Sequence, residues 1–278
     1  MRSRITITIS QDLLHQVDQF IDGRLIRNRS QAVETLIEQS LTPSISTAVI
    51  LAGGPGTDLP QFKNQPSALI TIDNQPLILH TLHHLKHHHF TKVIICANLQ
   101  DIRLKKLLTT SEFSSLQIIF SPESNHLGTG GALKQARPLI PNQPFLLIHS
   151  DILTNINLDK FAEFFLKQKS LACVAIKPRP GKISYGKVYL QGNTVVDFQQ
   201  PQTESPVSLI NTGIYLLDHR CLSLLPSHKK FNLEKTLIPH LISKNQLSAY
   251  TFQGLWFDVT EEQDYQEASR RWQQSKST

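Results

Sequence analysis

The sequence has few cysteines and no long hydrophobic run. Its three cysteines, Cys96, Cys173 and Cys221, are far apart and lie in apolar segments. That distribution is typical of buried thiols in a reducing compartment and excludes a dense disulfide framework. No apolar run reaches the length that spans a membrane, and the N-terminus lacks the apolar core of a signal peptide. We therefore expect a cytoplasmic protein with no membrane partner.

Charged residues are also scarce, at 18% of the chain, and acidic ones are outnumbered. The 28 Lys and Arg exceed the 22 Asp and Glu, which gives a formal net charge of +6. An excess of this sign favours polyanionic partners, either nucleic acid or phosphorylated metabolites. With 278 residues, 40% of them hydrophobic, the chain is long enough to bury a core in one or two domains.

Residues 1–41 predict a small unit of one strand and two helices. Residues 4–9 alternate strictly, with isoleucines on one face and Arg4, Thr6 and Thr8 on the other. Ser10 is placed to cap one helix, and Ser30, after a basic turn, is placed to cap a second. A single strand has no ladder partner and the unit is small, so we expect it to pair with a second copy. This predicts a homodimer or a higher even oligomer.

The same unit resembles the ribbon-helix-helix repressors, through RITITIS for the ribbon and RNRSQAVETLIEQSL for the second helix. The resemblance implies DNA as a partner, with Arg4, Thr6 and Thr8 touching base edges. It also implies that Arg29 and the amides after Ser30 contact phosphates. The alternative is a dimerisation unit whose threonines serve strand propensity alone. Residues 42–46, with one proline and small polar residues, predict a short linker.

From residue 47 to residue 272, segments with strand and helix patterns alternate. Such alternation predicts an α/β fold with a Rossmann-like, doubly wound and mostly parallel sheet. In that architecture ligands bind at the carboxyl ends of the strands. The predicted strands cover residues 49–52, 92–98, 117–120, 145–149, 171–176 and 212–217.

The stretch TAVILAGGPGTDLPQFKNQPSAL, residues 47–69, joins a buried strand to a glycine-rich loop. Bare backbone amides in such a loop can surround phosphate oxygens. The stretch resembles the opening of the sugar-1-phosphate nucleotidylyltransferases, LAGGxGTRL followed by PKAL. Asp58 and Ser67 stand where that family has an Arg and a Lys. The resemblance implies nucleotide binding by Ala52, Gly53, Gly54, Gly56 and Thr57.

Further matches to this family follow along the chain. SNHLGTGGALKQA, residues 124–136, resembles the loop beside the nucleobase, although an ordinary loop is the alternative. YGKV and LINTGIYLL resemble the segments that line the sugar, and QQP, with Gln200, stands where the family has EKP. The resemblance implies nucleobase contacts from Gly128, Thr129 and Gly130, and sugar contacts from Gly186, Asn211 and Glu234.

Two aspartates lie at strand ends in matching motifs. Asp151 closes FLLIHSD where the family reads LNGD, and Asp258 lies in WFDVT where the family reads WxDVG. The resemblance implies that both hold the catalytic Mg²⁺, an ion that prefers carboxylate and phosphate oxygens. A helix cap is the alternative for Asp151. In the histidine-rich segment of residues 80–89, His80, His84 and His87 share a helix face at ligand-compatible spacing, but an exposed polar face is the favoured interpretation.

Two functions remain open, because Asp58, Ser67 and Gln200 replace three cations of the family. A single Arg can contribute about 10³ to 10⁵ in the rate of phosphoryl transfer. This favours a dimeric DNA-binding regulator whose transferase-like domain binds an NTP or sugar nucleotide with weak or no catalysis. The alternative is an active sugar-1-phosphate nucleotidylyltransferase that converts sugar 1-phosphate and NTP into NDP-sugar and pyrophosphate. The lysines that could replace the lost cations are Lys63, Lys182 and Lys187.

Overall fold

The structure, a computed structural model, divides the chain into two compact units, Met1–Ser44 and Ile45–Thr278. The predictions for Arg4, Gly56, Asp58 and Gln200 fall outside the residues that it describes. The described ranges are 5–24, 26–41, 45–54, 57, 59–63, 65–98, 102–108, 111–181, 185–199 and 205–275.

The first unit contains two helices, α1 (Gln11–Gln19) and α2 (Arg29–Leu41). Ser10 caps α1 as predicted, because its hydroxyl accepts a hydrogen bond from the Leu13 amide. The prediction that Ser30 caps the second helix is wrong. The helix begins one residue earlier, and the Asn28 side chain accepts from the Gln31 amide at 3.0 Å.

The segment before α1 has no strand assignment and no ladder partner among the described residues. Ile5 and Ile7 are 70% and 52% exposed, although the prediction places the isoleucines against the helices. In residues 5–37, the buried side chains that the structure describes are Val17 and Ala32. Two such residues bury too little apolar area to hold a unit of this size together.

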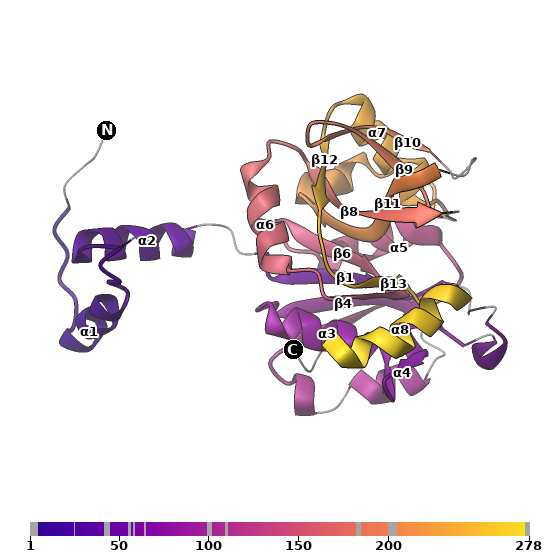
Figure 1. Cartoon of the computed structure of the whole chain (residues 1–278), viewed down its shortest axis with the longest axis horizontal. Coiled ribbons are helices and arrows are strands. Elements are labelled where there is room, and N and C mark those ends of the chain that lie inside the picture. The colour runs from indigo at the N-terminus through magenta and orange to yellow at the C-terminus, as the bar shows by residue number, and fades with distance from the viewer. Residues whose placement is uncertain are drawn as a thin grey trace. The chain divides into compact units, whose positions relative to one another are not determined.

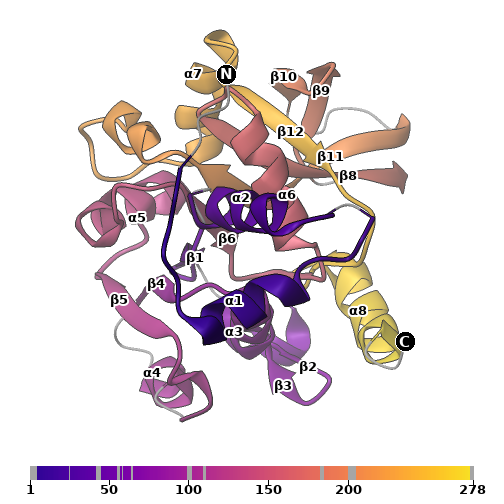
Figure 2. The same cartoon turned by 90° about the vertical axis from the view of Figure 1, so that its left-hand side faces the viewer.

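A nine-stranded sheet organises the second unit, in the order β5-β4-β1-β6-β11-β8-β12-β10-β9 (Figure 1). A right-angle view of the same strands is given in Figure 2. Its strands are β1 (Thr47–Leu51), β4 (Lys92–Asn98), β5 (Gln117–Glu123), β6 (Phe145–His149), β8 (Ala172–Gly181), β9 (Lys187–Gln191), β10 (Thr194–Gln199), β11 (Ser205–Leu217) and β12 (Leu247–Thr251).

The predicted mostly parallel sheet is correct only in part. Strands β5, β4, β1 and β6 are parallel to one another, and β12 is parallel to β8. In contrast, β11 is antiparallel to β6 and β8, and β10 is antiparallel to β12 and β9. Only Gly192 and Asn193 separate β9 from β10, and so short a connection can join antiparallel strands but not parallel ones. The result is a mixed α/β fold.

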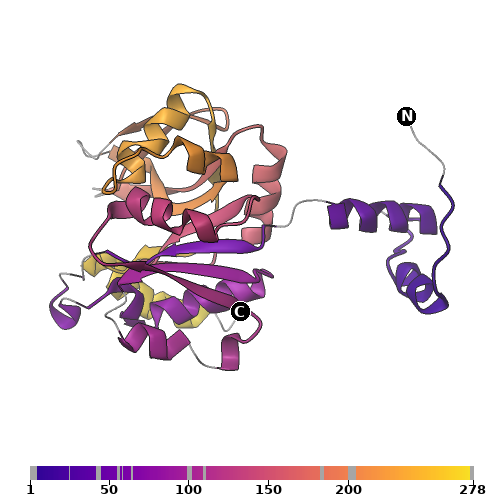
Figure 3. The same cartoon turned by 180° about the vertical axis from the view of Figure 1, so that it is seen from behind.

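Side-chain alternation along the central strands creates a core on each face of the sheet. On β1, Ala48 and Ile50 face one core, while Val49 and Leu51 face the other. Helices contribute apolar side chains to each core, and the view from behind shows the face that carries α5 (Figure 3). The first core includes α3 (Leu77–His87), α4 (Ile102–Leu108) and α6 (Leu158–Lys167), and the second includes α5 (Gly128–Ala136) and α7 (Leu237–Ser243).

A third, smaller core lies beneath the C-terminal helix. Residues Ala268 and Trp272 of this helix pack with Leu153 and Phe257 from a two-stranded sheet. Asp258 is the last residue of one of these two strands. The packing places it close to the carboxyl edge of the main sheet. The elements are α8 (Glu262–Ser275), β7 (Ile152–Thr154) and β13 (Trp256–Asp258), and two shorter strands, β2 (Thr71–Ile72) and β3 (Gln75–Pro76), precede α3.

The histidine-rich helix α3 joins neighbouring segments of the fold. The Nε2 of His80 is 2.9 Å from the Ile72 carbonyl oxygen, and the Nε2 of His84 is 2.8 Å from that of Ile156. Burial lowers the pKa of His84 to about 4. The predicted exposed polar face is therefore wrong for His80, which is 6% exposed. Among the described residues no group of three potential metal ligands is present, on this helix or elsewhere.

The three cysteines are free and buried, as predicted. Burial raises the pKa of all three thiols, and that of Cys173 to about 12. Within the described ranges, every helix is too short or too polar to cross a bilayer.

Candidate active site

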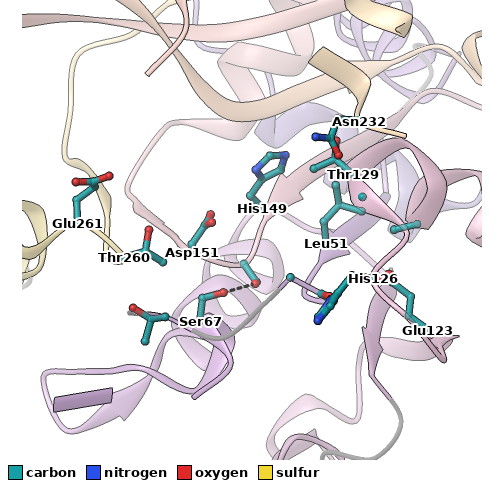
Figure 4. Close-up of a pocket in the computed structure, with 16 residues that line it drawn as sticks. Leu51, Ser67, Glu123, His126, Thr129, His149, Asp151, Asn232, Thr260 and Glu261 are labelled. Atoms are coloured by element: carbon teal, nitrogen blue, oxygen red, sulfur yellow. Dashed lines mark hydrogen bonds between the residues drawn. The ribbon is translucent and has the colours of Figure 1, made fainter. Parts of the chain in front are cut away.

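A cavity of about 480 Å³ opens at the carboxyl ends of the parallel strands (Figure 4). Ligands of open α/β sheets bind at this edge. The cavity collects the loops that follow β1, β5 and β6. Its lining residues are Leu51, Gly53, Gly54, Thr57, Ser67, Glu123, His126, Gly128, Thr129, Ala132, His149, Ser150, Asp151, Asn232, Thr260 and Glu261.

Two smaller cavities adjoin the large one. One, of about 140 Å³, shares Gly53, Glu123 and His126 with it. The other, of about 150 Å³, shares His149 and Asp151 with it. A ligand in the large cavity and a ligand in the second small one would therefore meet beside these last two residues. The second small cavity, called the inner cavity below, is also lined by Ile152, Tyr185, Gly186, Phe198, Asn211, Thr212, Gly213, Glu234, Trp256 and Asp258.

The first glycine loop follows β1 into the large cavity. Gly53 and Gly54 line it, and Thr57 lies at its wall with 3% exposure. A Cβ atom at Gly53 would overlap the Glu123 carboxylate, so only glycine allows this close approach. Ala52 does not line the cavity, because it is buried and its amide donates to the Cys96 carbonyl at 2.7 Å.

The second glycine loop opens α5. Gly128 has φ +75° and lines the cavity together with Thr129. Gly130 does not line it. Its amide donates to the Phe231 carbonyl at 3.0 Å, and a Cβ atom there would overlap the Phe231 ring. Of these three predicted nucleobase contacts, the structure brings two to the cavity and uses the third for packing.

Asp151 and Asp258 come together at the border of the two cavities. Burial, and then the neighbouring Asp151 carboxylate, raise the pKa of Asp258 to about 7. One Asp258 oxygen accepts from the Thr260 amide at 3.0 Å and from its hydroxyl at 2.6 Å. The Oδ1 atom of Asp151 is buried without a hydrogen-bond partner. The two carboxylates thus lie close together, and one oxygen of Asp151 accepts no hydrogen bond from the protein.

Such a pair suits a divalent cation. A cation between the carboxylates would offset their repulsion and occupy the unpartnered Asp151 oxygen. Mg²⁺ is commonly held by one or two carboxylates plus substrate phosphates, without a complete protein cage. The absence of a third ligand residue among the described positions fits that mode of binding.

The predicted sugar-binding residues Gly186, Asn211 and Glu234 all line the inner cavity. Asn211 is engaged within the protein, since its amide donates to the Tyr215 hydroxyl at 2.5 Å and its oxygen accepts from the Gly213 amide at 3.0 Å. Glu234 accepts from the Thr129 hydroxyl at 3.0 Å. This bond joins the glycine loop of the large cavity to the wall of the inner one.

Glu123 and His126 are site residues that the sequence patterns missed. Glu123 is only 4% exposed, its Oε1 atom has no hydrogen-bond partner, and burial raises its pKa. The Nδ1 atom of His126 is 2.6 Å from the Gly53 carbonyl oxygen. A longer strand prediction would have found Glu123, because β5 extends to this residue and ends at the same sheet edge as β1.

Lys and Arg side chains are absent from the described lining of both cavities. Ser67, in place of the family's Lys, shares a hydrogen bond of 2.9 Å with the Ser150 hydroxyl. Lys63 is exposed, and Lys187 is buried at the start of β9, and neither lines a cavity. Lys182 lies outside the described residues.

Residues 47–275 match the family described as nucleotidyl transferase. The chain belongs to this family. The match covers the second unit of the structure and both cavities, and leaves residues 1–46 outside it.

Curated members of the family are similar over most of the chain. A mannose-1-phosphate guanyltransferase of Yarrowia lipolytica is 29% identical over 223 residues, and one of Saccharomyces cerevisiae is 27% identical over 224 residues. Each alignment covers 78% of this chain. The chain spans 61% and 62% of the length of these two relatives.

Solved structures of the family share the fold. HddC from Yersinia pseudotuberculosis, complexed with GMP-PN, has a TM-score of 0.71 at 21% identity. That alignment covers 82% of this chain and 100% of HddC. A putative glucose-1-phosphate thymidylyltransferase from Bacillus anthracis, in complex with a sucrose, has a TM-score of 0.71 at 21% identity. That alignment covers 80% of this chain and 93% of the other.

The hypothesis of a DNA-binding regulator with weak or no catalysis is wrong. Relatives at 27–29% identity over most of the chain are named as guanyltransferases, and they favour the alternative of a working nucleotidylyltransferase. The physical error was to judge the site by its missing cations alone. Backbone amides at the glycine loops and a metal between two carboxylates also neutralise phosphate charge.

Of the residues predicted to contact DNA, the structure describes Thr6, Thr8, Arg29 and Ser30. Thr6 and Thr8 are exposed, and Ser30 is exposed inside the first turn of α2. Arg29 forms an ion pair with Asp18, with its Nε 2.7 Å from Oδ1. The hydrogen bond from Arg29 lowers the pKa of Asp18, so this guanidinium is engaged within its own unit.

Proposed function

We propose that this chain is a sugar-1-phosphate nucleotidylyltransferase. An oxygen of the sugar phosphate attacks the α-phosphorus of an NTP, the bond to the β-phosphate oxygen breaks, and pyrophosphate leaves. The supporting observation is the pair of Asp151, which lines both the large and the inner cavity, and Asp258, which lies beside it in the inner cavity. A reaction that joins two phosphorylated substrates needs adjacent binding sites that bring the two phosphates together.

The two cavities divide the substrates between them. The NTP occupies the large cavity, with its phosphates along the amides of Gly53 and Gly54. The sugar 1-phosphate occupies the inner cavity, beside Glu234. Mg²⁺ held by Asp151 and Asp258 would neutralise phosphate charge. The chain's own contribution is to position the reacting groups and to exclude water from them.

A guanine nucleotide and mannose 1-phosphate are the first substrates to try, since the relatives are named for this pair. Glu123 supports the choice of guanine as the base. Its buried carboxylate accepts hydrogen bonds but does not donate them when ionised. Guanine presents two adjacent donors on its Watson–Crick edge, whereas adenine presents one donor beside an acceptor. A guanine in the outer part of the large cavity would therefore satisfy the unpartnered Glu123 oxygen.

A coupled pyrophosphate-release assay tests the reaction across NTPs and sugar 1-phosphates with Mg²⁺. We expect turnover that falls roughly 100-fold or more in Asp151→Asn, because the metal loses one of its two carboxylates. Asp159→Asn is the matched control, since Asp159 is exposed and pairs with His88 far from both cavities. Absence of turnover with every substrate pair would refute the proposed reaction.

The choice of base has its own test, the Glu123→Gln substitution. Glutamine places a donor opposite the donors of guanine, so we expect kcat/KM for GTP to fall roughly 10- to 100-fold relative to ATP or UTP. Equal losses for all nucleotides would show that Glu123 only supports the loop at Gly53.

We further infer that residues 1–41 form a ribbon-helix-helix-type dimerisation unit, that residues 42–46 link it, and that residues 47–272 form the transferase domain. The division at residues 44 and 45 agrees with these boundaries. The amphipathic helix α1 and the exposed Ile5 and Ile7 before it support a homodimer. In this proposal the unit assembles the enzyme.

A further inference from the structure

His149 ends β6 and faces both cavities. In Figure 4 its ring lies between Asp151 on one side and Thr129 and Asn232 on the other. Gly213 makes room for the ring, because a Cβ atom there would come within 3.3 Å of it, and Gly213 has φ +73°. The ring is therefore held by the backbone of β11, beside the point where two ligands would meet.

The Nε2 atom of His149 has no hydrogen-bond partner and is buried. Other side-chain donors that line the inner cavity are engaged within the protein. The Tyr185 hydroxyl donates to Asp264, and the Thr212 hydroxyl donates to the Ala175 carbonyl. The indole of Trp256 donates to the Thr212 carbonyl, and the amide of Asn211 donates to Tyr215. Among the described side-chain nitrogens and hydroxyls that line this cavity, the Nε2 atom of His149 is the one buried without any hydrogen-bond partner.

A phosphate monoester in the inner cavity needs such a donor. The described lining holds the carboxylates of Asp151, Asp258 and Glu234, and it holds no Lys or Arg. Those carboxylates repel a phosphate unless a cation or an N–H group lies between them and it. The His149 Nε2 atom is 3.9 Å from Glu234 Oε1, so the imidazole stands in front of one of these carboxylates.

We propose that His149 donates a hydrogen bond from Nε2 to the phosphate of the sugar 1-phosphate and holds it in line for attack. This inference rests on the proposed function. An imidazole with hydrogen on Nε2 provides the donor whether or not the ring is charged. His149 lines both cavities, so one N–H group there can reach a phosphate held between them. In this proposal it compensates in part for the Lys and Arg that the described lining lacks.

The test compares His149→Phe with the unchanged chain. Phenylalanine keeps a ring of similar shape and removes both nitrogens. We expect the KM for sugar 1-phosphate to rise roughly 10- to 100-fold, the loss of one hydrogen bond to a charged group, while the KM for GTP changes less than about twofold. His149→Asn, which keeps a shorter donor, recovers part of the affinity. His87→Phe on the exposed end of α3 is the control and leaves both constants unchanged.

Equilibrium titration of mannose 1-phosphate, followed by its phosphorus NMR signal, measures the same contact without turnover. A wild-type chain that binds the sugar phosphate while His149→Phe binds it more than about tenfold more weakly supports the proposal. Equal binding by both, with unchanged melting temperatures, overturns it. A wild-type chain that releases no pyrophosphate would refute the proposed function, and this titration would still decide the role of His149.

Discussion

At the residue scale, Asp258 is a carboxylate that the fold holds in an environment unfavourable to its charge. Its carboxylate is buried beside Asp151, and two hydrogen bonds from Thr260 only partly offset the cost. A buried carboxylate with a like charge nearby keeps its proton longer than usual. In the metal-free protein this residue therefore keeps its proton up to about pH 7, and a bound cation would favour the ionised form.

The stability of the metal-free protein should fall as pH rises through about 7. The pKa of Asp258 is raised from 3.8 to about 7, so the folded chain holds a proton that the unfolded chain has lost. The stability from this group is present below pH 3.8 and is lost as pH rises through the folded pKa. Between about pH 5 and pH 8 the loss is roughly 2 to 3 kcal/mol.

Urea unfolding in EDTA at these two pH values measures the change. Asp258→Asn should show a smaller loss, and Mg²⁺ should restore stability to the unchanged chain at the higher pH. If Asp258→Asn keeps the full pH dependence, another group is responsible.

At the element scale, Asp264 ties α8 to the strands that carry the site. Asp264 is 1% exposed and accepts from both terminal nitrogens of Arg179 on β8. It also accepts from the Tyr185 hydroxyl at 3.2 Å and from the Asp258 amide at 3.1 Å. One carboxylate thus positions the C-terminal helix, a wall of the inner cavity and the backbone of a proposed metal ligand.

Asp264→Ala should lower both stability and Mg²⁺ affinity. Removing one partner of a buried pair costs about 3 to 5 kcal/mol, and the partial exposure of Arg179 places the expected loss near the lower value. The Asp258 amide would lose its acceptor, so the metal site would loosen. Glu267→Ala, on the same helix but in an exposed pair with Arg271, should cost less than about 1 kcal/mol. Urea unfolding and Mg²⁺ titration of both variants measure the difference, and equal effects would argue against a special role of Asp264.

At the scale of the whole molecule, the two units differ in how well each can fold alone. The second unit buries two cores around a nine-stranded sheet. The first unit, by contrast, leaves large apolar side chains in contact with water. A single unit cannot offset its conformational entropy with so little burial, which favours association. The exposed side chains are Ile5, Ile7, Leu13, Phe20 and Ile37.

Removing residues 1–44 should produce a monomer that still releases pyrophosphate. The reason is that both cavities and the family match lie beyond residue 44. Light scattering after size exclusion should give a dimer for the full chain and a monomer for the shortened one. Ile7→Glu should also dissociate the dimer, because it places a charge in the apolar face. A dimer that survives both changes would locate the interface in the second unit.

The amino-acid sequence by itself predicted many local elements of the second unit and several residues that line its cavities. Continuous apolar runs rich in strand-forming residues predicted β4 and β6 with their observed bounds, since a strand's pattern depends on its own residues. The glycine loop after β1 and the aspartates at 151 and 258 were identified by motifs that a short stretch of chain carries completely. These features are local, so no knowledge of distant partners was needed to predict them.

Only the tertiary structure decided which groups have partners. It placed Glu123 and His149 in the cavities with unpartnered atoms, and it showed that Asn211 is already engaged. It also made half of the strand pairings antiparallel and placed His84 against the distant Ile156 carbonyl. Burial and hydrogen bonding join residues far apart in the chain, and their energies depend on packing that no local pattern specifies.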